Sequence, residues 1–188
     1  VDISTLTHKT TRTMRSILLW MCILVGIQKI NGQTQVPVIE SFNVSLEKVN
    51  FPLIDHALPQ VVLISFNRNA EKEASTWVDP LVQKFIRKSG LLDAMFEAKL
   101  YSLSFLNESE FLQVKLAEDR LKSEIPSELH SATFFTHASK DSLRALLNGK
   151  SNVFVAVISS SGKLLGFVQG DYSLEKMEKI EQIILDAP

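Results

Sequence analysis

A short polar turn between a predicted strand and a predicted helix holds the side chains best placed for chemistry. Residues 61–66 form an apolar run rich in β-branched residues, and Asn67, Arg68 and Asn69 follow it. Apolar residues then recur at helical spacing over residues 70–85. A cation at the start of a helix is unfavourable unless an anion pairs with it. Arg68 is therefore a candidate for binding a carboxylate or a phosphate, and a solvated loop arginine is the alternative.

The strand and helix around this turn predict a fold, but the turn lacks the cysteines that the fold often carries. A buried strand that leads into an amphipathic helix is typical of the opening βαβ unit of a thioredoxin-like domain. Redox proteins of this class carry Cys-x-x-Cys here, because the helix N-terminus stabilises a thiolate. Residues 67–70 contain no cysteine, and residues 151–152 contain no proline, although such enzymes usually have a cis-proline there. The only cysteine is Cys22, so we predict that the protein is not an enzyme.

Trp77 and Asn152 are two further candidates for the same surface. Trp77 lies in the helical pattern shortly before Pro80, where a tryptophan usually packs in the core but can also face a partner. Asn152 directly precedes the apolar run at 153–158, on a loop expected to lie beside the turn. We predict a partner-binding surface that comprises Asn67, Arg68, Asn69, Trp77 and Asn152.

Composition and motifs favour neither a cofactor nor a nucleic acid. The 188 residues carry 20 basic and 21 acidic side chains, which gives a formal net charge of −1 and no basic patch for tracking phosphates. The four histidines are spread along the chain and do not have metal-ligand spacing. Gly162, Gly166 and Gly170 fall in a predicted hairpin and do not form a phosphate-binding loop. We therefore expect no metal, no cofactor and no nucleic-acid partner.

The N-terminal segment, residues 1–35, differs in composition from the rest. It is rich in threonine and in basic residues and contains Asp2 as its only acid, as mitochondrial transit peptides do. It also contains an apolar run at 17–27, which is shorter than the roughly 20 residues that span a bilayer. If Met14 is the true start, the same stretch resembles a secretory signal peptide. Import into mitochondria, secretion and a membrane anchor are the three interpretations.

Residues 36–188 predict one α/β domain. Strands are expected at 61–66, 99–106, 132–136, 153–158 and 163–168, with a possible edge strand at 41–46. Helices are expected at 70–88, 108–123, 140–147 and 173–185, the first of them kinked by Pro80. This order predicts a thioredoxin-like fold with a central mixed sheet, flanking helices, and a C-terminal β-hairpin and helix.

Several of these residues resemble a known family. Residues 62–66, followed by Arg68, Trp77, Pro80 and Phe85, resemble the start of the mitochondrial ATP synthase assembly factors that chaperone subunit a (subunit 6) of the Fo sector. Later segments fall in the order of the family, namely 125–126, 133–135, His137, 142–147, 152–154 and the hairpin at 161–170. The hairpin carries Leu165 and Phe167 where the family usually has an arginine and a tryptophan.

The resemblance implies a specific function. Members of that family are thioredoxin-like, have no redox cysteines and act on the matrix side of the inner membrane. It therefore implies a non-enzymatic, mitochondrial chaperone whose partner is Fo subunit a, with possible peripheral contact with the inner membrane. The alternative is a redox-inactive thioredoxin-like interaction module, either secreted or a structural subunit of a larger complex.

Overall fold

The computed structural model describes residues 34–54 and 57–187. The chain divides into two units, Val1–Gln33 and Thr34–Pro188. The predictions made for the N-terminal segment, including the apolar run at 17–27, lie outside the described residues. None of the helices within the described part is both long enough and apolar enough to cross a membrane.

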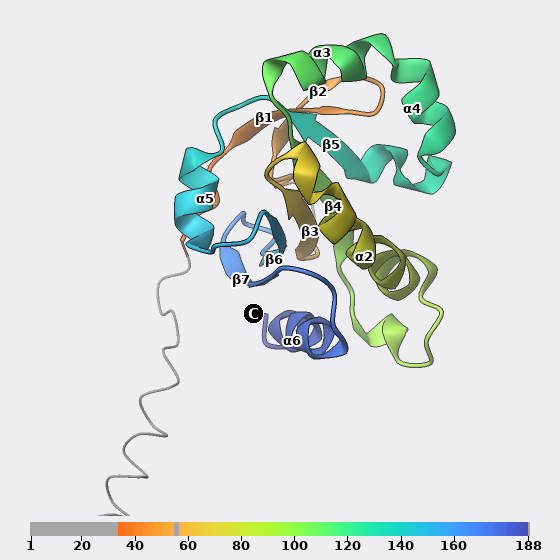
Figure 1. Ribbon diagram of the computed structural model, residues 1–188. Helices are drawn as coiled ribbons and strands as arrows, with labels where there is room; N and C mark the ends of the chain where they lie inside the picture. The colour runs from red at the N-terminus through yellow and green to blue at the C-terminus, as the bar shows by residue number, and fades with distance from the viewer. Residues whose placement is uncertain (1–33, 55–56, 188) are drawn as a thin grey trace, which may run out of the picture. The chain divides into compact units, whose positions relative to one another are not determined.

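A seven-stranded mixed sheet forms the centre of the second unit, with strand order β2-β1-β5-β4-β3-β6-β7 (Figure 1). The strands are β1 (Ile39–Asn43), β2 (Lys48–Phe51), β3 (Gln60–Ser65), β4 (Lys99–Phe105), β5 (Thr133–Thr136), β6 (Val153–Ile158) and β7 (Leu164–Gln169). β3 runs parallel to β4 and β4 runs parallel to β5, whereas β6 pairs antiparallel with both β3 and β7. The predicted thioredoxin-like α/β fold is confirmed.

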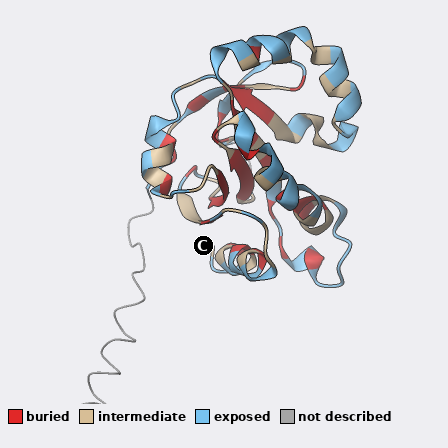
Figure 2. Ribbon diagram, in the orientation of Figure 1, coloured by how far each residue is buried: buried red, intermediate tan, exposed pale blue. Residues whose placement is uncertain are grey.

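Helices lie on both faces of this sheet. They are α2 (Glu71–Leu81), α3 (Glu108–Leu116), α4 (Glu118–Glu124), α5 (Asp141–Leu147) and α6 (Leu174–Leu185), with shorter segments η2 (Arg68–Ala70), η3 (Val82–Arg87), η4 (Asp93–Met95) and η5 (Ser127–Ala132). On one face, α5 packs Leu143 and Leu147 against a core that includes Phe66 and Phe154. On the other face, α2 and α6 cover a core that includes Val155. Figure 2 shows the buried strands between helices whose outer faces are exposed.

Two predicted elements differ in detail from the structure. The single helix expected at 108–123 is divided at Ala117, whose φ of −110° departs from helical geometry, into α3 and α4. The possible edge strand at 41–46 is instead the end of β1 and the turn that leads to β2, where Leu46 has a φ of 60°. Pro80 lies inside α2, and because proline lacks the N–H that an α-helix needs, the chain continues as the π-helical segment η3.

Candidate functional site

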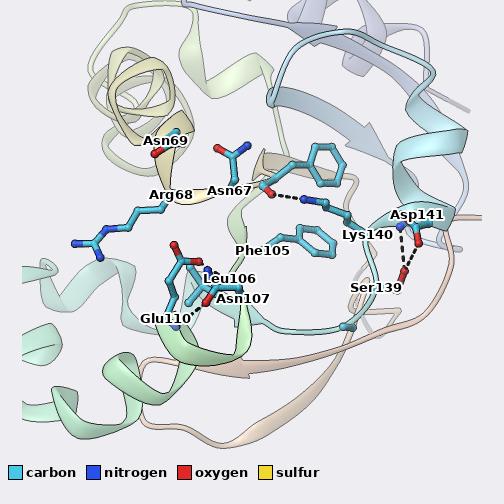
Figure 3. Close-up of a pocket in the computed structure, with 12 residues that line it drawn as sticks. Asn67, Arg68, Asn69, Phe105, Leu106, Asn107, Glu110, Ser139, Lys140 and Asp141 are labelled. Atoms are coloured by element: carbon cyan, nitrogen blue, oxygen red, sulfur yellow. Dashed lines mark hydrogen bonds between the residues drawn. The ribbon is translucent and has the colours of Figure 1, made fainter.

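The carboxyl ends of three parallel strands meet at one edge of the sheet and surround a pocket. β3, β4 and β5 each end there, and open α/β sheets bind ligands at this edge. The pocket has a volume of about 430 Å³. Its lining comes from the three loops that follow the strands and from the helices they lead into (Figure 3): Phe66, Asn67, Arg68, Asn69, Phe105, Leu106, Asn107, Glu110, Ala138, Ser139, Lys140 and Asp141.

Asn67 fixes the conformation of the turn that carries the predicted site. Its extended backbone precedes η2, and its Oδ1 accepts a hydrogen bond from the backbone N–H of Ala70 over 3.0 Å. This arrangement is an N-cap, which pairs one of the otherwise unsatisfied N–H groups of a helix start. Arg68 and Asn69 therefore occupy an ordered first turn and are both exposed to solvent at the pocket.

The side chain of Arg68 has no ion-pair or hydrogen-bond partner among the residues that the structure describes. Figure 3 shows the acid Glu110 below Arg68 in that view. The carboxylate of Glu110 is already held by its own helix, because its Oε2 accepts the backbone N–H of Asn107 over 2.9 Å in a capping box. The guanidinium of Arg68 is thus available to an incoming anion.

A second cation, Lys140, lines the pocket opposite the turn. Its Nζ donates to the carbonyl oxygen of Phe66 over 3.3 Å, which ties the start of α5 to the end of β3 (Figure 3). The two acids that line the pocket, Asp141 beside Lys140 and Glu110 on the side of Arg68, also have local partners. Asp141 accepts a hydrogen bond from the Ser139 hydroxyl over 2.9 Å, and Glu110 accepts one from the backbone N–H of Asn107.

Asn152 does not line the pocket, but it contacts Phe66, which does. Its backbone carbonyl accepts the N–H of Phe66 over 2.9 Å, so the expected proximity of this loop to the turn is confirmed. Its side-chain oxygen accepts two hydrogen bonds from the guanidinium of Arg144, over 3.2 and 3.1 Å. That guanidinium in turn lies over the ring of Phe66 at 5.0 Å. Asn152 therefore positions the pocket wall, and its side-chain oxygen is already engaged within the protein.

Trp77 lies in the core, which corrects the prediction that it forms part of the binding surface. Its side chain is fully buried against the face of the sheet that α2 and α6 cover. The indole N–H donates to the carbonyl oxygen of Gly170 over 2.7 Å, and the ring meets Tyr172 edge-on at 5.3 Å. The helical spacing of Trp77 places it on the apolar side of α2, where it faces the sheet.

A groove of about 590 Å³ adjoins the pocket and shares Asn67, Arg68, Leu106 and Glu110 with it. Its lining includes Ser65 and Ser104, half-buried residues whose hydroxyls are 3.1 Å apart on neighbouring strands. Arg120 also lines the groove, and its hydrogen bond to Glu124 over 2.7 Å raises the pKa of the guanidinium. Arg120 therefore already has an ion-pair partner within the protein, in contrast to Arg68.

Sequence reasoning identified the turn but missed the residues that complete the site. Lys140, Ser139 and Glu110 come from loops and helices far from Arg68 in sequence, and only the parallel pairing of the strands brings them together. One signal was available in residues 99–105, where serines alternate with large apolar residues. This alternation indicates a strand with one face open to solvent. Across residues 34–54 and 57–187, no group of three His, Cys, Asp or Glu side chains could hold a metal ion.

Comparisons with known proteins bear on the fold. No family model matches the chain, and no curated protein matches it. Among solved structures, it is similar to the thioredoxin domain of a thiol-disulfide oxidoreductase from Bacteroides vulgatus, with 12% identity, a TM-score of 0.50, and coverage of 81% of this chain and 96% of that chain. It is also similar to a candidate electron transfer protein from Aquifex aeolicus VF5, with 14% identity, a TM-score of 0.52, and coverage of 80% and 95%. These likenesses show a thioredoxin-like fold.

The prediction that the protein is not an enzyme is contradicted by these structures. The Bacteroides vulgatus protein is a thiol-disulfide oxidoreductase, so enzymes occur among the proteins that share this fold. The missing cysteines at residues 67–70 exclude one catalytic arrangement at that turn, and they do not exclude catalysis. At this level of identity the likeness extends to the fold alone. The resemblance to ATP synthase assembly factors is supported as far as the thioredoxin-like fold and no further.

Proposed function

We propose that this protein is a thioredoxin-like binding module that takes a partner polypeptide at the carboxyl ends of β3, β4 and β5. The observation that carries the proposal is the position of Arg68. It is an exposed cation at the start of the η2–α2 segment, its guanidinium has no partner in the described part of the chain, and it lies where the pocket and the groove meet. A carboxylate of the partner would satisfy this guanidinium through charge-assisted hydrogen bonds.

The two hollows together suit an extended polypeptide better than a compact small ligand. The pocket and the groove share four residues and continue from the α5 side of the turn to the half-buried serines of β3 and β4. The walls combine apolar atoms, such as those of Phe66, Phe105 and Leu106, with polar groups. Such a mixture is typical of non-obligate protein interfaces.

A cross-linking experiment with a matched control tests this proposal. A photo-cross-linking residue at Asn69 would trap the partner in cells, and the yield would be compared in wild type, Arg68→Ala and Arg87→Ala. Loss of a charge-assisted hydrogen bond costs about 1.5–3 kcal/mol, so we expect Arg68→Ala to weaken capture by roughly tenfold or more. Arg87→Ala removes the same charge from an arginine that pairs with Glu128 instead of lining the pocket.

Two measurements decide the outcome of that experiment. We expect the melting temperature of Arg68→Ala to equal that of the wild type, because the side chain of Arg68 makes no ion pair or hydrogen bond within the described residues. Unchanged capture by Arg68→Ala, or an equal loss in Arg87→Ala, would contradict the proposal.

A more specific form of the proposal takes Fo subunit a as the partner. It rests on the sequence resemblance at residues 62–66, followed by Arg68, Trp77, Pro80 and Phe85. The expected results are that depletion of the protein impairs assembly of ATP synthase and that Arg68→Ala captures less subunit a. If ATP synthase assembles normally without the protein, the proposal of Fo subunit a as the partner is wrong, whereas the general proposal of a binding module still stands.

The proposal of this partner places the protein in mitochondria, and secretion is the alternative. The chain contains two glycosylation acceptor triplets, at Asn43 and at Asn107. Both side chains have local roles in the folded unit, because the Asn43 amide donates to Glu47 over 2.7 Å and Asn107 caps α3. We expect a tagged full-length protein to enter mitochondria without a glycan. A glycan at either asparagine would show entry into the secretory pathway and contradict the mitochondrial proposal.

A further inference from the structure

A second surface is formed by the loop between η3 and β4, residues 88–98, which we call the apolar loop. Three of its large side chains are directed into solvent, with Leu91 99% exposed, Leu92 62% exposed and Met95 63% exposed. Figure 1 shows this yellow-green loop at the lower right of the ribbon, beyond the end of the helical segment that it follows. Clustered exposure of large apolar side chains marks an interaction site in a soluble domain.

The apolar loop is held in place, so the exposure of its tip is imposed by the fold. Lys84 of η3 forms ion pairs with Asp93 of the loop over 2.9 Å and with Glu181 of α6 over 2.6 Å. Asp93 also accepts the backbone N–H of Gly90 over 2.6 Å. Phe96 is buried and lies beneath the Lys84 ammonium at 4.3 Å. These contacts fix both sides of the loop and leave Leu91, Leu92 and Met95 outside.

Two lysines without an ion-pair partner in the described part of the chain lie at the base of the apolar loop. Lys88 precedes the tip and Lys99 follows it, and within the described residues neither of them forms an ion pair. Lys84, Asp93 and Glu181 form an ion-paired group of their own, so the charges near the tip that stay unpaired across residues 34–54 and 57–187 are Lys88, Lys99 and the exposed acid Glu97. An exposed apolar tip with lysines at its base matches the chemistry of the interface of a bilayer that contains anionic lipid.

We propose that the apolar loop inserts Leu91, Leu92 and Met95 into the interface of a membrane that contains anionic lipid. Lys88 and Lys99 would then lie at the level of the headgroups. A second copy of this chain fits the loop less well, because the lysines of the two copies would approach each other and repel. β4 begins at Lys99 and ends beside the candidate pocket, about 20 Å away at the rise of a β-strand. The pocket would thus stay open to a partner while the loop is bound.

A fluorescent label at position 91 tests the insertion directly. The label would be attached to Leu91→Cys in a full-length Cys22→Ser background and compared with the same label at Leu116→Cys, an 88% exposed leucine on α3. Vesicles would be made of phosphatidylcholine with or without phosphatidylserine. With the anionic vesicles, we expect the label at position 91 to shift to the blue and to be quenched by brominated lipid, and the label at position 116 to do neither. With the neutral vesicles, we expect no change at either position. Every variant carries the same Cys22→Ser substitution within the apolar run at 17–27, so the contribution of this run is common to both labels.

Charge removal provides the second arm of the test. Each lysine near an anionic surface contributes about fivefold to binding, so Lys88→Gln and Lys99→Gln are each expected to shift the titration of the position 91 label by about that factor. Leu92→Ser is expected to reduce the blue shift of the same label. The absence of a shift at position 91, an equal shift at position 116, or a shift that accompanies dimerisation without vesicles would each overturn the proposal.

Discussion

Trp77 and Gly170 are joined by a hydrogen bond of 2.7 Å from the indole N–H to the backbone carbonyl oxygen, across 93 positions of sequence. The bond links α2 to the turn that leads from β7 into α6. Both helices cover the same face of the sheet, and Trp77 is fully buried between them. One side chain thus fills the core and at the same time fixes the connection to the last helix.

We expect Trp77→Phe to destabilise the domain by about 1–3 kcal/mol, because the Gly170 carbonyl would lose its donor while most of the ring packing remains. Trp77→Ala should cost about 3–5 kcal/mol, since it also leaves a cavity. Urea denaturation followed by circular dichroism measures both values. If Trp77→Phe is as stable as the wild type, the hydrogen bond does not contribute to folding.

The ion-pair group around Lys84 predicts a loss of stability in acid. The hydrogen bond from Lys84, followed by that from the Gly90 N–H, lowers the pKa of Asp93 below its ordinary value of 3.8. A carboxyl whose pKa is lower in the folded state stabilises the fold above its unfolded pKa, and this contribution is lost as the pH falls through the folded pKa. We therefore expect the melting temperature to fall below about pH 4, and Asp93→Asn to weaken this acid dependence.

The same ion-pair group also predicts a loss of stability at high pH. Partial burial disfavours the charged form of Lys84, but its hydrogen bonds to Glu181 and Asp93 outweigh this effect and raise its pKa above 10.5. The contribution of Lys84 is therefore present below its unfolded pKa and is lost as the pH rises through the folded value. Lys84→Met should remove this alkaline decrease in melting temperature. An identical pH profile in Lys84→Met and wild type would contradict the assignment.

Gln60 is buried, and its side-chain amide hydrogen-bonds to both backbone groups of one residue, Leu53. Its Oε1 accepts the N–H of Leu53 over 3.3 Å and its Nε2 donates to the carbonyl oxygen of Leu53, at a position with no exposure to solvent. We expect Gln60→Leu to cost about 1–3 kcal/mol of unfolding free energy, because both backbone groups lose their partner. Gln113→Leu on the exposed face of α3 is the control and should change stability by less than about 0.5 kcal/mol.

Gly166 and Ile183 form a close contact between β7 and α6. A Cβ at position 166 would lie 2.7 Å from Cδ1 of Ile183, so the side chain would have to move. We expect Gly166→Ala to destabilise the domain by about 1–3 kcal/mol through overpacking. Because Ile183→Val removes Cδ1, the double variant should be more stable than Gly166→Ala alone. Additive effects in this cycle would show that the two residues do not interact.

The sequence by itself determined the class of fold and most of its elements, although it did not predict β2 or the division of the helix at Ala117. Residues 153–158 are apolar throughout and form β6 with the same bounds, and the polar turn at 67–69 separates a buried strand from a helix as its composition predicted. Periodicity records which side of an element is buried, so these features depend on neighbours in sequence. The same local pattern also placed Trp77 on an apolar helix face, where the structure finds it buried.

Only the tertiary structure decided which residues share the candidate site. Arg68, Glu110 and Lys140 follow three different strands, and they line one pocket because those strands run parallel and end at the same edge of the sheet. Strand order and direction arise from long-range pairing, and no local pattern encodes them. The same applies to Lys84, whose partners Asp93 and Glu181 come from a loop and from the last helix. Sequence patterns therefore identified the turn, and the packing of distant segments determined what surrounds it.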